Sequence, residues 1–166
     1  MKKLAVISDI HDNLANLDKA LQYILKKTEV NYLIFTGDGQ SFEVWQKIDQ
    51  LPFPTFGAIG NADVTLVDRL KDLKNIKIFD PLGKIEIANR KIIFNHYPDI
   101  VKQALNSTEK KYDLALHGHT HQPWEEYYQG TRILNPGNIA NLLYSPSFAL
   151  IDLDDMKSKL IFLNEI

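Results

Sequence analysis

The sequence contains no cysteine, and this absence excludes several kinds of chemistry at once. Without a thiol, the chain cannot form disulfide bonds, thiolate nucleophiles or zinc sites with sulfur ligands. Any metal ion must therefore be bound by His, Asp, Glu, Asn or water.

Long hydrophobic runs are also absent. The N-terminal apolar run, Leu4 to Ile7, ends at Ser8-Asp9. A secretory signal needs a longer apolar segment, and a membrane span needs about 20 apolar residues. We therefore expect a soluble protein located in the cytoplasm, with no membrane partner.

An excess of charge of one sign is lacking as well. The 19 basic and 21 acidic residues give a formal net charge of −2. No global positive field attracts a nucleic acid, so nucleic acid is not an expected partner, whereas a small phosphate ester remains open. No repeat, low-complexity tract or linker divides the 166 residues, and we expect one domain over residues 1–166.

Apolar runs and helical periodicities alternate in the first half of the chain. Strands are predicted at 4–7, 32–35 and 55–59, and helices at 13–27, 42–51 and 63–73. This order indicates parallel strands joined by right-handed crossovers. The second half predicts a hairpin around Asn89-Arg90, a helix after Pro98, and strands at 114–116, 125–128, 132–134, 148–153 and 160–163. The pattern favours an α/β protein in which mixed sheets pack together with helices outside.

Polar, metal-capable residues directly follow nearly every apolar strand, where ligands bind in open α/β sheets. All five histidines lie in these loops. One such histidine is usually a surface or core residue, but five of five beside carboxylates indicate a metal site. The strand-end residues are Asp9, His11, Asp38, Asn61, His96, His117, His119 and His121.

The ligand types narrow the choice of metal. Histidine nitrogen with carboxylate oxygen, and no sulfur, suits manganese, iron, zinc or cobalt. Asp9 and His11 are two residues apart, so on an extended segment they point the same way and can bind one ion. His119 and His121 share that spacing, and Asp38 is the candidate for a carboxylate that bridges two ions. Glycines beside these residues, such as Gly118, allow the backbone to approach closely.

Six short motifs occur in order along nearly the whole chain: Asp9-Ile10-His11 with Asn13 after it, Gly37-Asp38, Gly60-Asn61, Asn95-His96-Tyr97-Pro98, Gly118-His119-Thr120-His121 and Asn135-Pro136-Gly137. Together this set resembles the calcineurin-like metallophosphoesterases, and within them the small bacterial and archaeal phosphodiesterases.

The resemblance implies a four-layer αββα sandwich of two mixed β-sheets flanked by helices. It implies two divalent cations, foremost Mn²⁺, with Ni²⁺, Zn²⁺, iron and Co²⁺ as alternatives. One ion would be bound by Asp9, His11, Asp38 and His121, and the other by Asp38, Asn61, His96 and His119.

A hydroxide between the two ions would attack a small phosphate ester, most specifically a diester. In this scheme Asp38 and Asn61 are the catalytic residues, and Asn61 and Asn13 contact the substrate.

Three places depart from the family pattern. Ala62 stands where many members have a histidine that helps the leaving group. Gly39-Gln40 follows the Gly-Asp motif where apolar residues are common, and Asn138 replaces the usual serine. The loss at Ala62 predicts a preference for esters of acidic alcohols, such as aryl diesters. His117, Asp12 and Asp63 remain open as substitute acids, although Asp63 reads better as a helix N-cap and His117 as a packing residue.

The alternative function is a catalytically weak or inactive scaffold that keeps the fold and the metal site. Seven intact ligands argue against it, and the absence of an added nucleic-acid module argues against a nuclease. For Asn61, a simple Gly-Asn turn remains a competing interpretation. Tyr127 and Tyr128 cannot both face inward on a strand, so one is expected at the surface, where it hints at a homo-oligomer.

Overall fold

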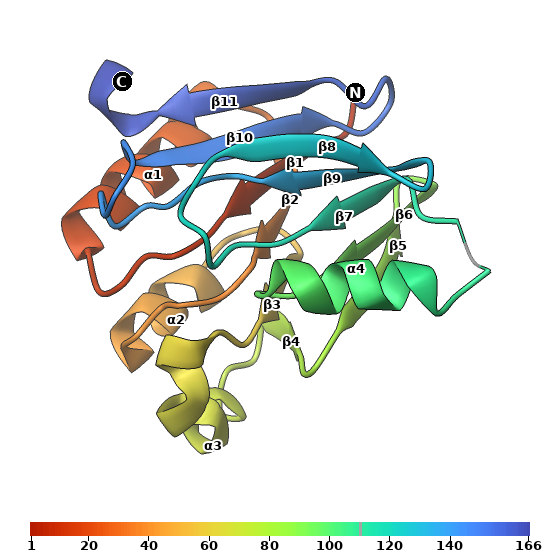
Figure 1. Ribbon diagram of the computed structural model, residues 1–166. Helices are drawn as coiled ribbons and strands as arrows, with labels where there is room; N and C mark the ends of the chain where they lie inside the picture. The colour runs from red at the N-terminus through yellow and green to blue at the C-terminus, as the bar shows by residue number, and fades with distance from the viewer. Residues whose placement is uncertain (110) are drawn as a thin grey trace.

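Two mixed β-sheets form the centre of the structure, a computed structural model that describes residues 1–109 and 111–166 (Figure 1). The first sheet has the strand order β11-β10-β1-β2-β3-β4 and the second β5-β6-β7-β9-β8. The strands of the first sheet are β1 (Lys3–Ile7), β2 (Val30–Phe35), β3 (Thr55–Ala58), β4 (Ile76–Phe79), β10 (Ser147–Asp152) and β11 (Ser158–Phe162). Those of the second are β5 (Gly83–Ile87), β6 (Arg90–Phe94), β7 (Leu114–Leu116), β8 (Trp124–Tyr128) and β9 (Thr131–Asn135).

Each sheet combines a parallel centre with antiparallel strands at its edge. Strands β1 to β4 are parallel, and β10 and β11 extend that sheet with antiparallel pairings. In the second sheet β6, β7 and β9 are parallel, and β5 and β8 pair antiparallel at the two edges. The helices between parallel strands supply the crossovers that these strands require. They are α1 (Leu14–Lys27), α2 (Phe42–Asp49), η1 (Asn61–Leu66), α3 (Val67–Leu70) and α4 (Pro98–Asn106), whereas η2 (Leu163–Glu165) follows the last strand.

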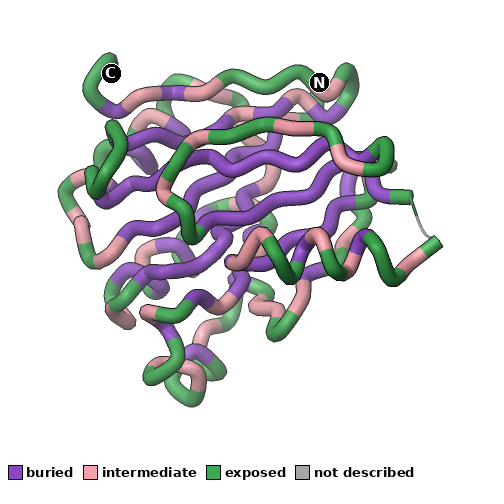
Figure 2. The backbone as a smooth tube through the Cα atoms, in the orientation of Figure 1, coloured by how far each residue is buried: buried purple, intermediate pink, exposed green. Residues whose placement is uncertain are grey.

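Three hydrophobic clusters fill the spaces between four layers of helices and sheets, which confirms the predicted sandwich. Along β1, Leu4 and Val6 point between the sheets, whereas Ala5 and Ile7 face the helices, because successive side chains of a strand alternate. The layer between the sheets contains residues of both, such as Phe94. Helices α1 and α2 cover the outer face of the first sheet, and α4 covers the second. Figure 2 shows the buried strands at the centre and the exposed segments in the loops, along the helices and along the edge strands β8 and β11.

Local sequence accounts for most element ends. The side chain of Asn13 caps α1 by accepting a hydrogen bond from the N–H of Asn16 at 3.1 Å, and Pro98 begins α4. Within the described residues, no helix combines the length and the hydrophobicity needed to cross a membrane.

Three predictions of secondary structure were wrong or incomplete. The single helix expected at 63–73 is a 3₁₀ turn, η1, followed by the one-turn helix α3. The hairpin turn is Ala88-Asn89, one residue earlier than expected, because both residues have positive φ (47° and 60°), as a type I′ turn requires. Strand β4 was not predicted, since only Ile76 and Ile78 alternate in so short a segment. Of the two neighbouring tyrosines, Tyr127 is the exposed one.

Candidate metal centre

Loops from both sheets are joined by backbone hydrogen bonds beyond the ends of the strands. The N–H of Asp9, after β1, donates to the carbonyl of Gly37, after β2, at 3.0 Å. The N–H of Gly118, after β7, donates to the carbonyl of His96, after β6, at 3.0 Å. The loop between β9 and β10 joins them, because the N–H of Ala140 donates to the carbonyl of Asp9 at 3.0 Å. The loops are therefore fixed against one another at one end of the sandwich.

Five of the predicted ligands have a left-handed backbone conformation. The φ angles are 52° at Asp9, 44° at His11, 63° at Asp38, 69° at His119 and 60° at His121. This region is sparsely populated by residues other than glycine, and functional sites are where such conformations accumulate. The turns bring the side chains towards a common point.

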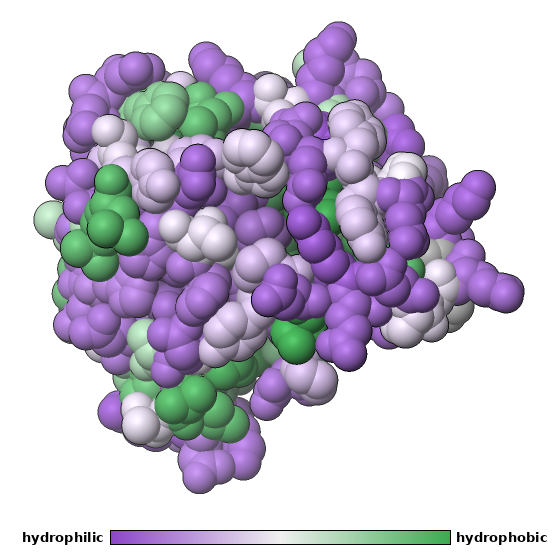
Figure 3. All heavy atoms as spheres, viewed as in Figure 1, coloured by the Kyte–Doolittle hydropathy of each residue, from purple (hydrophilic) through white to green (hydrophobic). Residues whose placement is uncertain are grey.

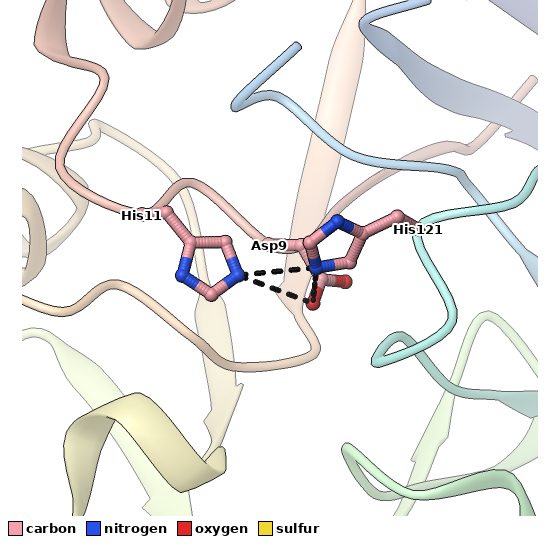
Figure 4. Close-up of side chains that lie close together, drawn as sticks. All are labelled: Asp9, His11 and His121. Atoms are coloured by element: carbon pink, nitrogen blue, oxygen red, sulfur yellow. Dashed lines mark hydrogen bonds and ion pairs between the residues drawn. The ribbon is translucent and has the colours of Figure 1, made fainter. Parts of the chain in front are cut away.

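The first cluster consists of Asp9, His11 and His121 (Figure 4). The Nε2 atoms of His11 and His121 lie 3.1 Å apart, and His121 Nε2 lies 3.3 Å from Asp9 Oδ1. The distance from His11 Nε2 to Asp9 Oδ1 is 3.9 Å. Two residues from the loop after β1 therefore meet one from the loop after β7, as the spacing of the motifs predicts.

The second cluster consists of Asn61, His96 and His119. Asn61 Oδ1 lies 3.2 Å from His96 Nε2 and 3.1 Å from His119 Nδ1. The two histidine nitrogens are 3.2 Å apart. The three atoms form a nearly equilateral triangle around one point.

Asp38 lies between the two clusters. Its Oδ2 atom is 3.5 Å from His11 Nε2 of the first cluster and 3.3 Å from His96 Nε2 of the second. Its other oxygen, Oδ1, accepts a hydrogen bond from the N–H of Ala62 at 2.8 Å, which fixes the orientation of the carboxylate. One oxygen atom is thus shared by both clusters, in the place of a bridging ligand.

The spacing of these atoms fits divalent cations. Around an ion with bonds of about 2.1 Å, neighbouring ligand atoms lie about 3.0 Å apart in octahedral and about 3.4 Å apart in tetrahedral geometry. The contacts between His11 and His121, and between His96 and His119, are 3.1 and 3.2 Å. Two neutral imidazole nitrogens that both present lone pairs repel each other at this distance, and a cation between them removes the repulsion. The side chains present therefore fit the two-metal expectation.

The protonation of the metal-free site follows from its buried carboxylates. Burial acts to raise the pKa of Asp38, but the hydrogen bond and charge of His96 outweigh it and hold the pKa below its usual value. Burial acts to lower the pKa of His96, yet the hydrogen bond and charge of Asp38 raise it. The hydrogen bond with Asp9 raises the pKa of His121. The carboxylates therefore make both histidines bind protons more tightly than free imidazoles do.

Two hydrogen bonds orient histidines for metal binding. His96 Nδ1 donates to the carbonyl of Thr36 at 2.9 Å, and His11 Nδ1 donates to Gln40 Oε1 at 3.2 Å. A proton on Nδ1 leaves the lone pair of Nε2 facing the clusters, as a ligand requires. Gln40 was noted in the sequence only as a departure from the family pattern, and its contact with His11 gives it a function.

Glycine is required at two positions by close approach. A Cβ atom at Gly118 would lie 2.6 Å from Asp9 Oδ2, and one at Gly60 would lie 2.2 Å from Asp38 Oδ1. Both distances are far below a normal contact. The close approach predicted for Gly118 is confirmed.

Asp63 is the functional residue that sequence reasoning misassigned. It is not an N-cap, because it lies inside η1 and is fully buried. Its carboxylate accepts hydrogen bonds from the backbone of Asp38 (2.7 Å), Gly39 (2.9 Å), Gln40 (3.0 Å) and Gly60 (3.0 Å), and from the indole of Trp45 (3.0 Å). The sequence signal for this role was that Asp63 stands two residues after the predicted ligand Asn61. With both oxygens engaged, Asp63 is unsuited to act as an acid on a substrate.

Three further predicted residues have defined positions. His117 is buried, and its Nδ1 atom lies 3.0 Å from the carbonyl of Gly118, in agreement with a packing role. Asn13 donates from Nδ2 to the carbonyl of Ala140 at 3.0 Å besides capping α1, and its contact with a substrate stays a prediction. Asp12 is exposed beside the site.

Comparison with known proteins agrees with this arrangement. Residues 1–156 match the calcineurin-like phosphoesterase superfamily domain. The chain is 29% identical to the phosphodiesterase MJ0936 of Methanocaldococcus jannaschii, over 97% of this chain and 99% of that protein. The structure of an archaeal phosphodiesterase has a TM-score of 0.83 at 27% identity, covering 96% and 99% of the two chains. Vacuolar Protein Sorting 29 from Cryptosporidium parvum, at a TM-score of 0.68, 20% identity and coverage of 96% and 95%, shows a shared fold alone.

Proposed function

The chain belongs to the calcineurin-like phosphoesterase superfamily, and from this membership we propose that it is a metal-dependent phosphodiesterase that hydrolyses a small phosphate ester. The observation that carries the proposal is the position of Asp38 Oδ2, within 3.5 Å of a histidine nitrogen of each cluster. A shared carboxylate between two His-rich groups is the arrangement that two-metal hydrolysis needs.

Each cluster would hold one divalent cation together with Asp38, and we propose Mn²⁺ as the metal, with Ni²⁺, Zn²⁺, iron and Co²⁺ also suited to these ligands. Two bound cations would supply a deprotonated water as the nucleophile and neutralise charge on the phosphate. The amide of Asn61, which lies beside His96 and His119, is a neutral ligand. It would hold the phosphate in position without adding negative charge.

The leaving alcohol receives little help from the protein in this scheme. Ala62 has no proton to give, Asp63 is engaged in five hydrogen bonds, and His117 is buried. We therefore propose that the enzyme prefers esters of acidic alcohols, which leave as anions without protonation. Equal rates on p-nitrophenyl diesters and simple alkyl diesters would contradict this preference.

The test of the function starts from metal-free protein. Bis-p-nitrophenyl phosphate and p-nitrophenyl phosphate are assayed after Mn²⁺, Ni²⁺, Zn²⁺ or Mg²⁺ is added back, with Asp38→Asn and His119→Ala in parallel. Asp18→Asn, at a half-buried acid of α1 that pairs with Lys47 rather than with either cluster, is the matched control. We expect activity that returns with metal, favours the diester, and falls at least about 100-fold in the two site variants alone.

The alternative is a binding protein that keeps the metal site without turnover. The shared fold with Vacuolar Protein Sorting 29 and the missing donor at Ala62 are what favour it. Metal binding without hydrolysis of either ester would support this alternative and overturn the proposed enzyme.

A further inference from the structure

The loop between β9 and β10 exposes an unusual group of apolar side chains. The exposed fractions are 46% for Leu142, 88% for Leu143 and 43% for Tyr144, and these three residues are called the apolar loop below. Figure 3 shows apolar atoms at the left edge of the view, where this loop lies in front of the start of α1. Exposed apolar residues are common singly, whereas three in succession point to a contact surface.

The apolar loop is fixed directly to the metal centre. Asn138 is fully buried, and its Nδ2 donates to the carbonyls of His121 at 3.1 Å and Tyr144 at 3.2 Å. Its Oδ1 accepts from the N–H of Leu142 at 3.0 Å. Asn138 occupies the position where the family pattern has a shorter serine, which cannot make all three bonds. The loop is thereby held at a set distance from a predicted metal ligand.

Folding alone does not explain the leucine at the tip. Leu143 has a φ of 64°, a conformation that glycine or asparagine adopts at lower cost. The side chain is almost fully exposed, so it gains little from burial in the folded chain. Strain and exposure at the same residue indicate that the side chain serves a ligand.

An aromatic ring lies beside the second cluster. The ring of Tyr97 packs edge-on against the rings of His96 and His119, with centroids 4.9 Å away in both cases. Among the described residues, none of the hydrogen bonds and ion pairs of the two clusters and Asp38 involves Lys or Arg. A phosphate held there would have the ring of Tyr97 nearby and no cationic side chain among these contacts.

We propose that the apolar loop is the subsite for an apolar, preferably aromatic, organic group on the phosphate of the substrate. The inference rests on the proposed function, since it assumes that the phosphate binds at the metal centre. Leucine and tyrosine side chains bind such a group by removing its surface from water, and the tyrosine ring favours an aromatic partner.

Binding of phosphonates tests the subsite separately from turnover. Methylphosphonate and phenylphosphonate share one phosphorus group and differ in the organic group alone. We titrate each into Mn²⁺-loaded protein by calorimetry and expect phenylphosphonate to bind about 5-fold or more tightly. In the Leu142→Ser/Leu143→Ser variant, which keeps Tyr144, this preference should decrease by about half or more, while methylphosphonate binds as before. Leu25→Ser on α1, a residue 47% exposed, is the matched control and should keep the preference.

A second variant separates binding from folding. Leu143→Gly removes the side chain and relieves the positive φ, so its melting temperature should equal or exceed that of the wild type. The preference for phenylphosphonate should nevertheless decrease in Leu143→Gly.

Each contrary result has its own meaning. Equal binding of the two phosphonates to the wild type overturns the subsite and leaves the proposed function standing. Binding of neither, in protein that holds Mn²⁺, overturns the proposed function and the subsite with it. Light scattering that shows a dimer in the wild type and a monomer in Leu142→Ser/Leu143→Ser would assign the loop to a subunit interface, against the proposal.

Discussion

The buried carboxylate of Asp63 accepts a hydrogen bond of 2.7 Å from the backbone N–H of Asp38, the residue whose side chain lies between the two clusters. The same carboxylate accepts from Gly39 and Gly60. The two loops that carry Asp38 and Asn61 are therefore held together by one acid.

Replacement of Asp63 with asparagine should weaken metal binding without removing any ligand. The amide keeps one acceptor oxygen and turns an N–H₂ group towards backbone donors, which leaves several buried N–H groups unpaired. We expect metal affinity to fall about 10- to 100-fold and stability to fall by roughly 1–3 kcal/mol. Calorimetric titration with Mn²⁺ and urea unfolding measure the two effects. Wild-type affinity in Asp63→Asn would show that the loop is held in place by other contacts.

The contact between Gln40 and His11 predicts two opposite effects of substitution. Gln40→Leu removes the acceptor that holds the proton on His11 Nδ1, and metal affinity should fall about 10-fold. Gln40→Glu replaces it with a carboxylate, which makes the imidazole a better ligand, and affinity should be retained or rise. Titrations of both variants with Mn²⁺ give the answer. Equal losses in the two variants would mean that residue 40 acts through the shape of its loop.

A methyl group at position 118 should damage the first cluster. In Gly118→Ala the new Cβ meets the side chains of Ser8 and Asp9, which must move. We expect one Mn²⁺ fewer per chain and a stability loss of roughly 1–3 kcal/mol. Gly130→Ala is the control. Its new Cβ meets nothing within 4 Å, so no ligand is displaced, but an alanine is strained at the φ of 80°. That variant should lose stability and keep both metals.

Opposite pH trends are expected for the metal-free and metal-loaded protein. The pKa values of His96 and His121 are raised in the metal-free fold, so the folded state binds protons more tightly than the unfolded chain. This stabilisation is complete below the unfolded pKa of about 6.5 and is lost as the pH rises through the folded values. Metal binding needs the unprotonated nitrogens and therefore strengthens over the same range.

Thermal melts at about pH 6 and about pH 8, with EDTA or with Mn²⁺, check this linkage. As the pH rises, loss of the histidine contribution should lower the melting temperature of the EDTA-treated protein. Over the same range, the increase in melting temperature caused by Mn²⁺ should become larger. His121→Asn should reduce both slopes. Parallel curves with and without metal would show that these histidines do not exchange protons for cations.

The convergence of the predicted ligands was foreseeable from the sequence because each follows a strand that is apolar enough to recognise. The run Tyr32 to Phe35 predicted β2, and Asp38 comes three residues later. The carboxyl ends of parallel strands meet at one edge, so the convergence of these residues follows from topology. The four-layer order was expected from the resemblance, and the three hydrophobic clusters bear it out.

Relationships between distant residues were not predictable in the same way. Asp63 contacts Asp38 across 25 positions, and nothing local to either residue indicates the other. Strand β10, with Leu150 opposite Ala5, inserts beside β1 as its antiparallel neighbour. That pairing joins the two ends of the sequence, and no local pattern specifies it. The left-handed conformation of His11 was likewise hidden, since no glycine marks it.

The left-handed conformations of His11, His119 and His121 bear on how this protein can evolve. Glycine or asparagine at these positions would relieve strain of about 1 kcal/mol each. If selection acted on folding alone, substitutions that remove the three histidines would be favoured. Their presence indicates that the fold is less stable than it could be because the candidate site needs these conformations.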